Sequence, residues 1–157
     1  NEFTGNAGVD VLSFGGTENG MMFGEAVIFF NKQAGQNMKF LRKQAMQLHS
    51  KMRFIGAQFQ ALLSNDLWKR NASHANSMAK LLARELERFP SIKITRPAEA
   101  NSVFALMPPA IIESLQKEFF FYVWNDRLSE VRLMCSFDTT EEEIKRFADV
   151  LGNLLAG

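Results

Sequence analysis

The sequence predicts an α/β protein in which helices cover a small antiparallel sheet. Short segments rich in β-branched and aromatic residues alternate with longer segments of helical periodicity. Beyond the middle of the chain they follow the order strand, strand, helix, strand, strand, helix, which favours a self-contained α/β domain over residues 64–157. The 157 residues are 46% apolar and 22% charged, which is typical of a globular chain with room for one core, or for one small domain and part of another.

Two strands are expected at the start, over about 9–14 and 25–30. Neither shows polar alternation, so we expect both to be buried on two faces. The link between them, "GGTENGMMFG", contains four glycines, which permit backbone conformations that other residues avoid. Two buried strands need neighbours that these residues do not supply, so residues 1–63 are interpreted as the edge of a larger sheet with its connecting helix.

Apolar residues at near-helical spacing then predict one long helix over about 36–63. Asn65 and Asp66 offer a cap for a second helix that runs to about Arg88. Phe89-Pro90 ends this helix, because the residue before a proline is pushed out of helical geometry.

The remaining segments predict four strands and two helices. The strands are "IKIT" (92–95), "SVFALM" (102–107), "FFFYVW" (119–124) and "VRLMCSF" (131–137). Pro108-Pro109 predicts a short helix over about 109–117, since proline suits a first turn. Asp138-Thr139-Thr140 and the three glutamates that follow predict a capped final helix. The aromatic run of 119–124 is interpreted as a core strand, with an interface as the alternative.

Charge and composition argue against several kinds of partner. The formal net charge is +1, so no nucleic acid or anionic membrane is expected as partner. No apolar run approaches the roughly 20 residues that span a bilayer. Cys135 is the single cysteine, which favours a reducing, cytoplasmic location. No metal site is expected.

Three stretches carry a resemblance to a known family: "GVDVLSFGGTENGMMFGEAVIFFN" (8–31), "SKMRFIGAQFQALL" (50–63) and "VRLMCSFDTTEEEI" (131–144). They resemble the low-specificity L-threonine aldolases, which are pyridoxal-phosphate (PLP) enzymes of the aspartate aminotransferase fold type, fold type I. The resemblance runs along the whole chain and covers the C-terminal half, or a little less, of a usual member. It implies that residues 1–63 are a remnant of the PLP-binding large domain, with a hairpin of its sheet, and that residues 64–157 are the small domain.

The resemblance also gives a meaning to Glu18. In the family this loop reads Gly-Gly-Thr-Lys-Asn-Gly, and its lysine forms the internal Schiff base with PLP. Such a bond needs a primary amine, which Glu18 does not have. A carboxylate would in addition repel the anionic cofactor.

Three further residues receive roles from the resemblance. Arg132 matches the small-domain arginine that holds the substrate α-carboxylate, for which a planar guanidinium is well suited. Arg53 matches an arginine near the cofactor phosphate, and the Thr17 hydroxyl is a further phosphate contact. The alternatives are an edge charge or ion pair for Arg132 and a helix-surface salt bridge for Arg53.

The activity that the resemblance implies is PLP-dependent retro-aldol cleavage of L-threonine or L-allo-threonine to glycine and acetaldehyde. This chain is expected to be inactive alone, because Glu18 replaces the lysine and the upstream half of the site is absent. The alternatives are a non-catalytic structural or interaction fragment, or another fold type I activity such as hydroxymethyl transfer or transamination. The expected partners are a small amino-acid substrate and a second copy or a partner half-domain.

Overall fold

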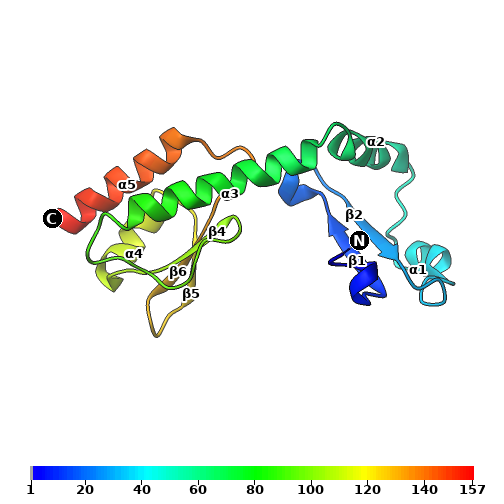
Figure 1. Ribbon diagram of the computed structural model, residues 1–157, viewed down its shortest axis with the longest axis horizontal. Helices are drawn as coiled ribbons and strands as arrows, with labels where there is room; N and C mark the ends of the chain where they lie inside the picture. Colours follow the sequence, from blue (N-terminus) through cyan, green and yellow to red (C-terminus); the bar gives the residue numbers. More distant parts are fainter. Residues whose placement is uncertain (1) are drawn as a thin grey trace. The chain divides into compact units, whose positions relative to one another are not determined.

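The computed structural model describes residues 2–157 (Figure 1). The chain divides into two compact units, Asn1–Trp68 and Lys69–Gly157, and each is described by itself. The division proposed from the sequence, after residue 63, stays a prediction about domain boundaries. Among the described residues no helix is long and apolar enough to cross a bilayer.

The first unit is built on a two-stranded hairpin. Its elements are η1 (Gly5–Ala7), β1 (Val11–Gly15), η2 (Thr17–Asn19), β2 (Glu25–Phe29), α1 (Met38–Gln44) and α2 (Met52–Leu63). The strands β1 and β2 pair antiparallel, with Val11 opposite Phe29 and Gly15 opposite Glu25. A small apolar cluster of Met21, Ile55 and Leu62 joins the loop after β1 to α2.

The strands β1 and β2 contain no buried residue, although the Phe14 ring of β1 lies 6.2 Å from the Phe59 ring of α2. The described chain supplies no further strand to this sheet, so the expected burial on two faces stays a prediction. One prediction for this unit was wrong, since the single helix expected over 36–63 is two helices separated by a loop. Met46 has a positive φ of 57°, and the Gln47 amide donates to the Arg42 carbonyl, which ends α1. Helical spacing of apolar residues did not reveal this interruption.

The helix predicted to follow Asn65 and Asp66 is present as α3 (Leu67–Leu86). Both preceding residues have positive φ, 52° and 56°, and the chain enters the helix directly after them. The face of α3 that the sequence pattern predicts to be apolar is the buried one, and it comprises Ala75, Met78, Ala79, Leu82 and Leu86.

The second unit is a four-stranded antiparallel sheet with helices on one side (Figure 1). After α3 its elements are β3 (Lys93–Ile94), β4 (Ser102–Leu106), α4 (Pro109–Gln116), β5 (Tyr122–Asn125), β6 (Glu130–Met134) and α5 (Glu141–Ala156). The strand order is β3-β4-β6-β5. The predicted order of elements is thereby confirmed, including the proline at the start of α4.

Alternation along the strands divides the sheet into a covered and an open face. Val103 and Ala105 of β4 and Val131 and Leu133 of β6 are buried in one core with apolar residues of α3, α4 and α5. The residues between them point to the other face. The aromatic run 119–124 was expected to be a core strand, but its strand begins at Tyr122, and several of its rings are exposed.

Candidate functional site

The loop that contains Glu18 is a closed turn bounded by glycines. Thr17, Glu18 and Asn19 form η2, which ends at Gly20 with a left-handed φ of 108°. The Met21 amide donates to the Gly16 carbonyl at 3.0 Å. A Cβ on Gly16 would lie 2.1 Å from the Met21 sulfur, so a larger residue there would displace the buried Met21 side chain.

Side chains on both sides of Glu18 hold this loop in place. The Met21 side chain is buried against Ile55 and Leu62 of α2. The Met22 amide donates to the Gln58 side-chain oxygen at 2.9 Å, and the Asn19 side-chain amide donates to the Trp68 carbonyl at 2.9 Å. The loop is therefore packed on α2, while Thr17 and Glu18 stay exposed on its outer side.

Arg53 lies in the first turn of α2 and is exposed. Its guanidinium carbon lies 5.4 Å from the centroid of the neighbouring Phe54 ring. In the described part of the chain, no hydrogen bond or ion pair joins Arg53 to Thr17 or Glu18. Arg53 and the two loop residues are thus carried by one packed substructure, with no hydrogen bond or ion pair between Arg53 and the loop among the described residues.

Arg132 lies in the second unit, at the middle of β6 on the open face of the sheet. Its cross-strand partners are Phe104 on β4 and Tyr122 on β5. Its Nε is buried and has no hydrogen-bond partner among residues 2–157. An unsatisfied buried donor costs about 1–3 kcal/mol. No carboxylate of the described chain pairs with this guanidinium, which leaves it able to bind an anion.

The nearest acidic residue on β6 is already engaged. Glu130 is buried, and its carboxylate accepts hydrogen bonds from the Thr95 hydroxyl at 2.6 Å and from Arg96 Nη2 at 3.0 Å. The Thr95 hydroxyl and the charge of Arg96 outweigh burial and lower the pKa of Glu130. The carboxylate is therefore held in its charged form on Arg96.

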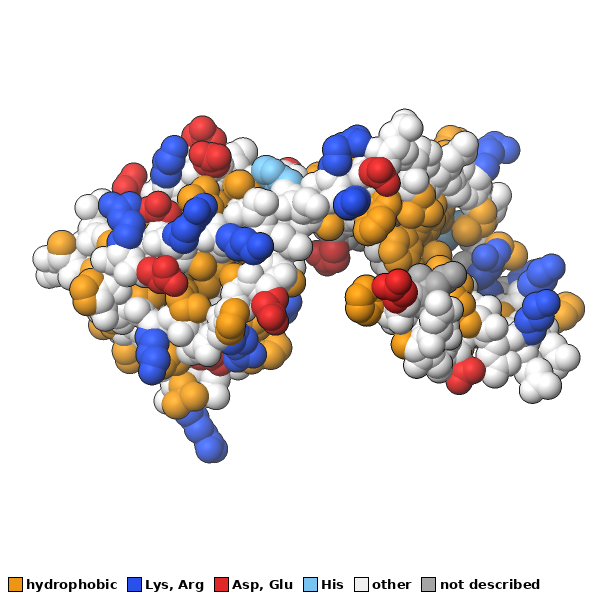
Figure 2. Space-filling view, viewed as in Figure 1, with side chains coloured by type: hydrophobic (Ala, Val, Ile, Leu, Met, Phe, Trp, Pro, Cys, Tyr) orange, Lys and Arg blue, Asp and Glu red, His pale blue; other side chains and the backbone are white. Residues whose placement is uncertain are grey.

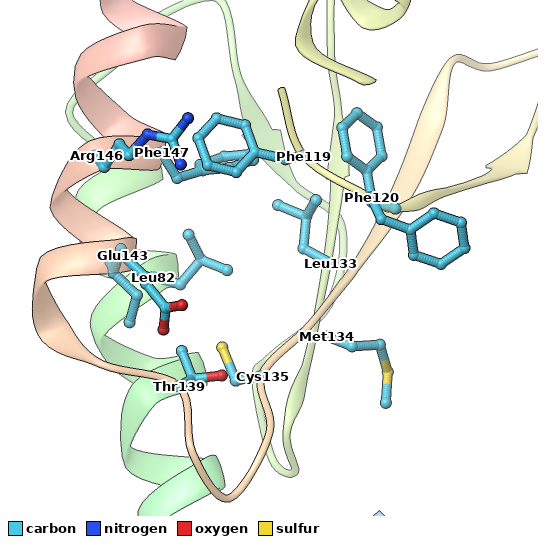
Figure 3. A pocket seen from close by; sticks show the side chains of 12 residues that line it. Leu82, Phe119, Phe120, Leu133, Met134, Cys135, Thr139, Glu143, Arg146 and Phe147 are labelled. Atoms are coloured by element: carbon cyan, nitrogen blue, oxygen red, sulfur yellow. The ribbon is translucent and has the colours of Figure 1, made fainter. Parts of the chain in front are cut away.

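A separate hollow of about 210 Å³ lies in the second unit where α5 meets β6 (Figure 3). Its walls are mainly apolar, with Phe119 and Phe147 in edge-to-face contact at 5.0 Å. Cys135 is on the wall, and burial raises the pKa of its thiol to about 11. None of the predicted site residues lines this hollow.

Four residues around Arg132 were not identified from the sequence: Thr95, Arg96, Phe104 and Trp124. Alternation in "SVFAL", "YVWN" and "EVRLM" was a usable signal, since it places Phe104, Trp124 and Arg132 on one face. The pairing order of the strands was the missing information, because β6 and not β5 lies beside β4.

The fold matches the C-terminal part of a threonine aldolase, and the class of protein to which this match points is the PLP enzymes of fold type I. A solved structure of Leishmania major threonine aldolase aligns with a TM-score of 0.83 and 33% identity, over 94% of this chain and 44% of that chain.

Sequence comparison points to one group within that class. The chain is 43% identical over 148 residues to low specificity L-threonine aldolases of a Pseudomonas species and of Pseudomonas aeruginosa. Each match covers 94% of this chain and 42% of the relative, so the chain spans less than half the length of these proteins. No family model matches the sequence. The resemblance to low-specificity L-threonine aldolases is confirmed over that part of their length.

The cofactor that the resemblance implies fits these residues only in part. Thr17 and Arg53 offer a hydroxyl and a cation of the kind that binds a phosphate. Glu18, however, presents an exposed carboxylate, which cannot form the covalent bond that the resemblance implies for this position. The loop as it stands therefore does not fit a covalently held PLP.

Proposed function

We propose that this chain is part of a PLP-dependent L-threonine aldolase, which cleaves L-threonine or L-allo-threonine to glycine and acetaldehyde, and that alone it does not catalyse this reaction. The observation that carries the proposal is the 43% identity over 94% of the chain, combined with a carboxylate at position 18. PLP, when bound to such an enzyme, supplies an electron sink for the carbanion left by Cα–Cβ cleavage.

In this proposal Arg132 binds the α-carboxylate of the amino acid. Its position on an open sheet face and its lack of a carboxylate partner in the described chain support this role. A guanidinium grips a carboxylate in two places and so fixes its orientation. Thr17 and Arg53 are proposed to contact the cofactor phosphate.

Glu18 has two effects on the proposed site. It cannot provide the amine that anchors the cofactor, and it places a negative charge beside an anionic ligand. The loop itself is intact, because the contacts that hold it belong to Asn19, Met21 and Met22. Exchanging the side chain at position 18 should therefore leave the fold unchanged.

The test compares the chain with its Glu18→Lys and Glu18→Gln variants. Each protein is mixed with PLP, and its absorption is recorded at about 420 nm. It is then reduced with borohydride and digested, and the labelled peptides are identified by mass. We expect a reduced PLP adduct at position 18 in Glu18→Lys. The glutamine variant removes the charge without adding an amine, and no adduct should form at its position 18.

Mapping the adduct is necessary because surface lysines also react with PLP. If Glu18→Lys carries no more label at residue 18 than at exposed lysines such as Lys39 or Lys69, the loop does not build a cofactor site. The proposed function is then wrong for this chain.

A second candidate function is a non-catalytic interaction unit, and the surface of the first unit favours it (Figure 2). Large apolar side chains are exposed there, including Met22, Phe40, Met46 and Phe54. Exposed apolar surface of this kind marks an association surface. We propose that a second copy or a partner half-domain covers it. Sedimentation velocity over a range of protein concentrations tests this, and a monomer at every concentration would argue against self-association.

A further inference from the structure

Two aromatic rings meet across Arg132. Phe104, Arg132 and Trp124 lie on β4, β6 and β5, which are neighbouring strands. Neighbouring strands are about 4.8 Å apart, so β4 and β5 are separated by about twice that distance. The ring centroids of Phe104 and Trp124 are nevertheless only 5.5 Å apart, in edge-to-face contact. Both rings therefore lean over the central strand.

A bulge in β5 gives Trp124 this position. Val123 pairs with Val131 and Asn125 pairs with Glu130, so Trp124 is an extra residue between two consecutive partners. β5 is an edge strand. Bulges on edge strands bend the strand and change the direction of a side chain, and they are common beside functional sites.

The guanidinium of Arg132 lies within reach of both rings. Its central carbon is 5.5 Å from the Trp124 centroid and 6.0 Å from the Phe104 centroid, distances at which a cation is attracted to a ring face. Its Nε is buried and has no hydrogen-bond partner in the described chain. The side chain is thus oriented by aromatic contact, with no hydrogen bond to its Nε.

The other charged groups nearby are occupied. Arg96 lies 3.9 Å from the Phe104 centroid and is paired with Glu130. Glu130, two residues from Arg132 on the same strand, also accepts a hydrogen bond from Thr95. The Glu130 carboxylate is therefore engaged by Thr95 and Arg96, and no ion pair joins it to Arg132 in the described chain.

We propose that Phe104 and Trp124 are positioning residues, which hold the Arg132 guanidinium so that its two terminal nitrogens face outward. The inference rests on the carboxylate role of Arg132 proposed above and specifies the geometry of that role. Because Nε is closed to ligands, a carboxylate would bind end-on through both Nη atoms, not side-on through Nε.

The test uses the whole 157-residue chain labelled with ¹⁵N, and follows the Nε–Hε signal of Arg132, assigned by its loss in Arg132→Lys. In the parent chain we expect this signal to be shifted upfield by the two rings. Trp124→Leu should return it toward the position of the other arginines and make its solvent exchange at least about tenfold faster. Trp124→Phe keeps a ring and should retain most of the shift.

Tyr122→Leu is the matched control. Tyr122 is exposed, lies on β5 with Trp124, and is the cross-strand partner of Arg132. Its ring, however, contacts the Phe120 ring, with 5.1 Å between the centroids. This variant should leave the Arg132 signal in place. An unshifted signal in the parent chain, or equal effects of Tyr122→Leu and Trp124→Leu, would overturn the positioning role.

Titration with glycine, and with ethanolamine as the analogue without a carboxylate, separates this inference from the proposed function. We expect glycine, and not ethanolamine, to shift the Arg132 signal. The affinity for glycine should be about fivefold weaker in Trp124→Leu than in the parent chain. If the ring-dependent shift is present but glycine has no effect, the aromatic positioning stands and the carboxylate role fails. If glycine binds equally well to both proteins, the carboxylate role stands and the positioning role is wrong.

Discussion

Arg96 donates a hydrogen bond to the buried carboxylate of Glu130 at 3.0 Å, across a sequence separation of 34 residues. The pair ties the segment after β3 to the central strand β6. Thr95 donates to the same carboxylate oxygen at 2.6 Å. Glu130 lies on the same strand as Arg132, two residues before it, and its carboxylate is engaged by Thr95 and Arg96.

The stability of the second unit should fall in acid because of Glu130. Its folded-state pKa is below the ordinary value of 4.5, chiefly through the Thr95 hydroxyl and also through Arg96, against the effect of burial. The charged form is therefore favoured by folding. This stabilisation is present at neutral pH and is lost as the pH falls below 4.5 toward the lowered pKa.

Urea unfolding of Glu130→Gln should show a loss of about 1–2 kcal/mol at neutral pH and a smaller decrease between about pH 5 and pH 3 than the parent. Glu113→Gln is the control, because Glu113 is exposed and pairs only with exposed Lys117 at 3.7 Å. Its unfolding free energy should stay within about 0.5 kcal/mol of the parent. Equal pH dependence in Glu130→Gln and the parent would contradict the prediction.

Cys135 should be unreactive in the folded protein. Burial raises the pKa of its thiol to about 11, so the reactive thiolate is scarce at pH 8. A chromogenic disulfide reagent should react slowly in buffer and fast in denaturant, and the signal is clean because this is the single cysteine. Fast reaction in native buffer would show that the hollow beside α5 opens readily.

The thiol of Cys135 should also make the second unit less stable in alkali. The thiol of an unfolded chain ionises at about pH 8.5, whereas the folded one stays protonated until much higher pH. The contribution of the buried, protonated thiol to the free energy of unfolding is complete below the unfolded pKa and is lost as the pH rises toward about 11. Cys135→Ala should lack this component, measured as the difference in unfolding free energy between pH 8 and pH 10.

The start of α5 should depend on Thr140. Its hydroxyl accepts from the Glu143 amide at 3.2 Å, and the Glu143 carboxylate accepts from the Thr140 amide at 2.8 Å. Thr140→Ala should cost about 1 kcal/mol, while Thr140→Ser keeps the hydroxyl and should cost little. Equal unfolding midpoints in urea for the two variants would show that the cap does not stabilise the unit.

Two adjacent methionines test how the Glu18 loop is held. Met21 is 6% exposed and packs on α2, whereas Met22 is 84% exposed. Met21→Ala should lower the stability of the first unit by about 2–4 kcal/mol, and Met22→Ala should change it by less than about 0.5 kcal/mol. Amide hydrogen exchange in α2 is the measurement, since it reports this unit separately. Similar exchange in both variants would mean that Met21 does not anchor the loop.

Elements with local signals were predicted well from the sequence. The proline at the start of α4 and the Thr140–Glu143 cap act within a few residues of themselves, so their effect is visible in the sequence alone. The apolar face of α3 follows from helical spacing, and the order of elements in the second unit follows from composition. The position of Glu18 in a glycine-bounded loop was likewise evident from residues next to one another.

The sequence by itself thus determined the elements of the second unit, the nature of the loop at Glu18, and the resemblance that gives Glu18 and Arg132 their proposed roles. Tertiary structure decided the rest. The Glu18 loop is held on α2 because Met21 packs against Ile55 and Leu62. The two rings meet over Arg132 because β6 lies between β4 and β5 and because Trp124 sits in a bulge. Both are contacts between residues far apart in the chain, and such contacts exist only once the strands have paired.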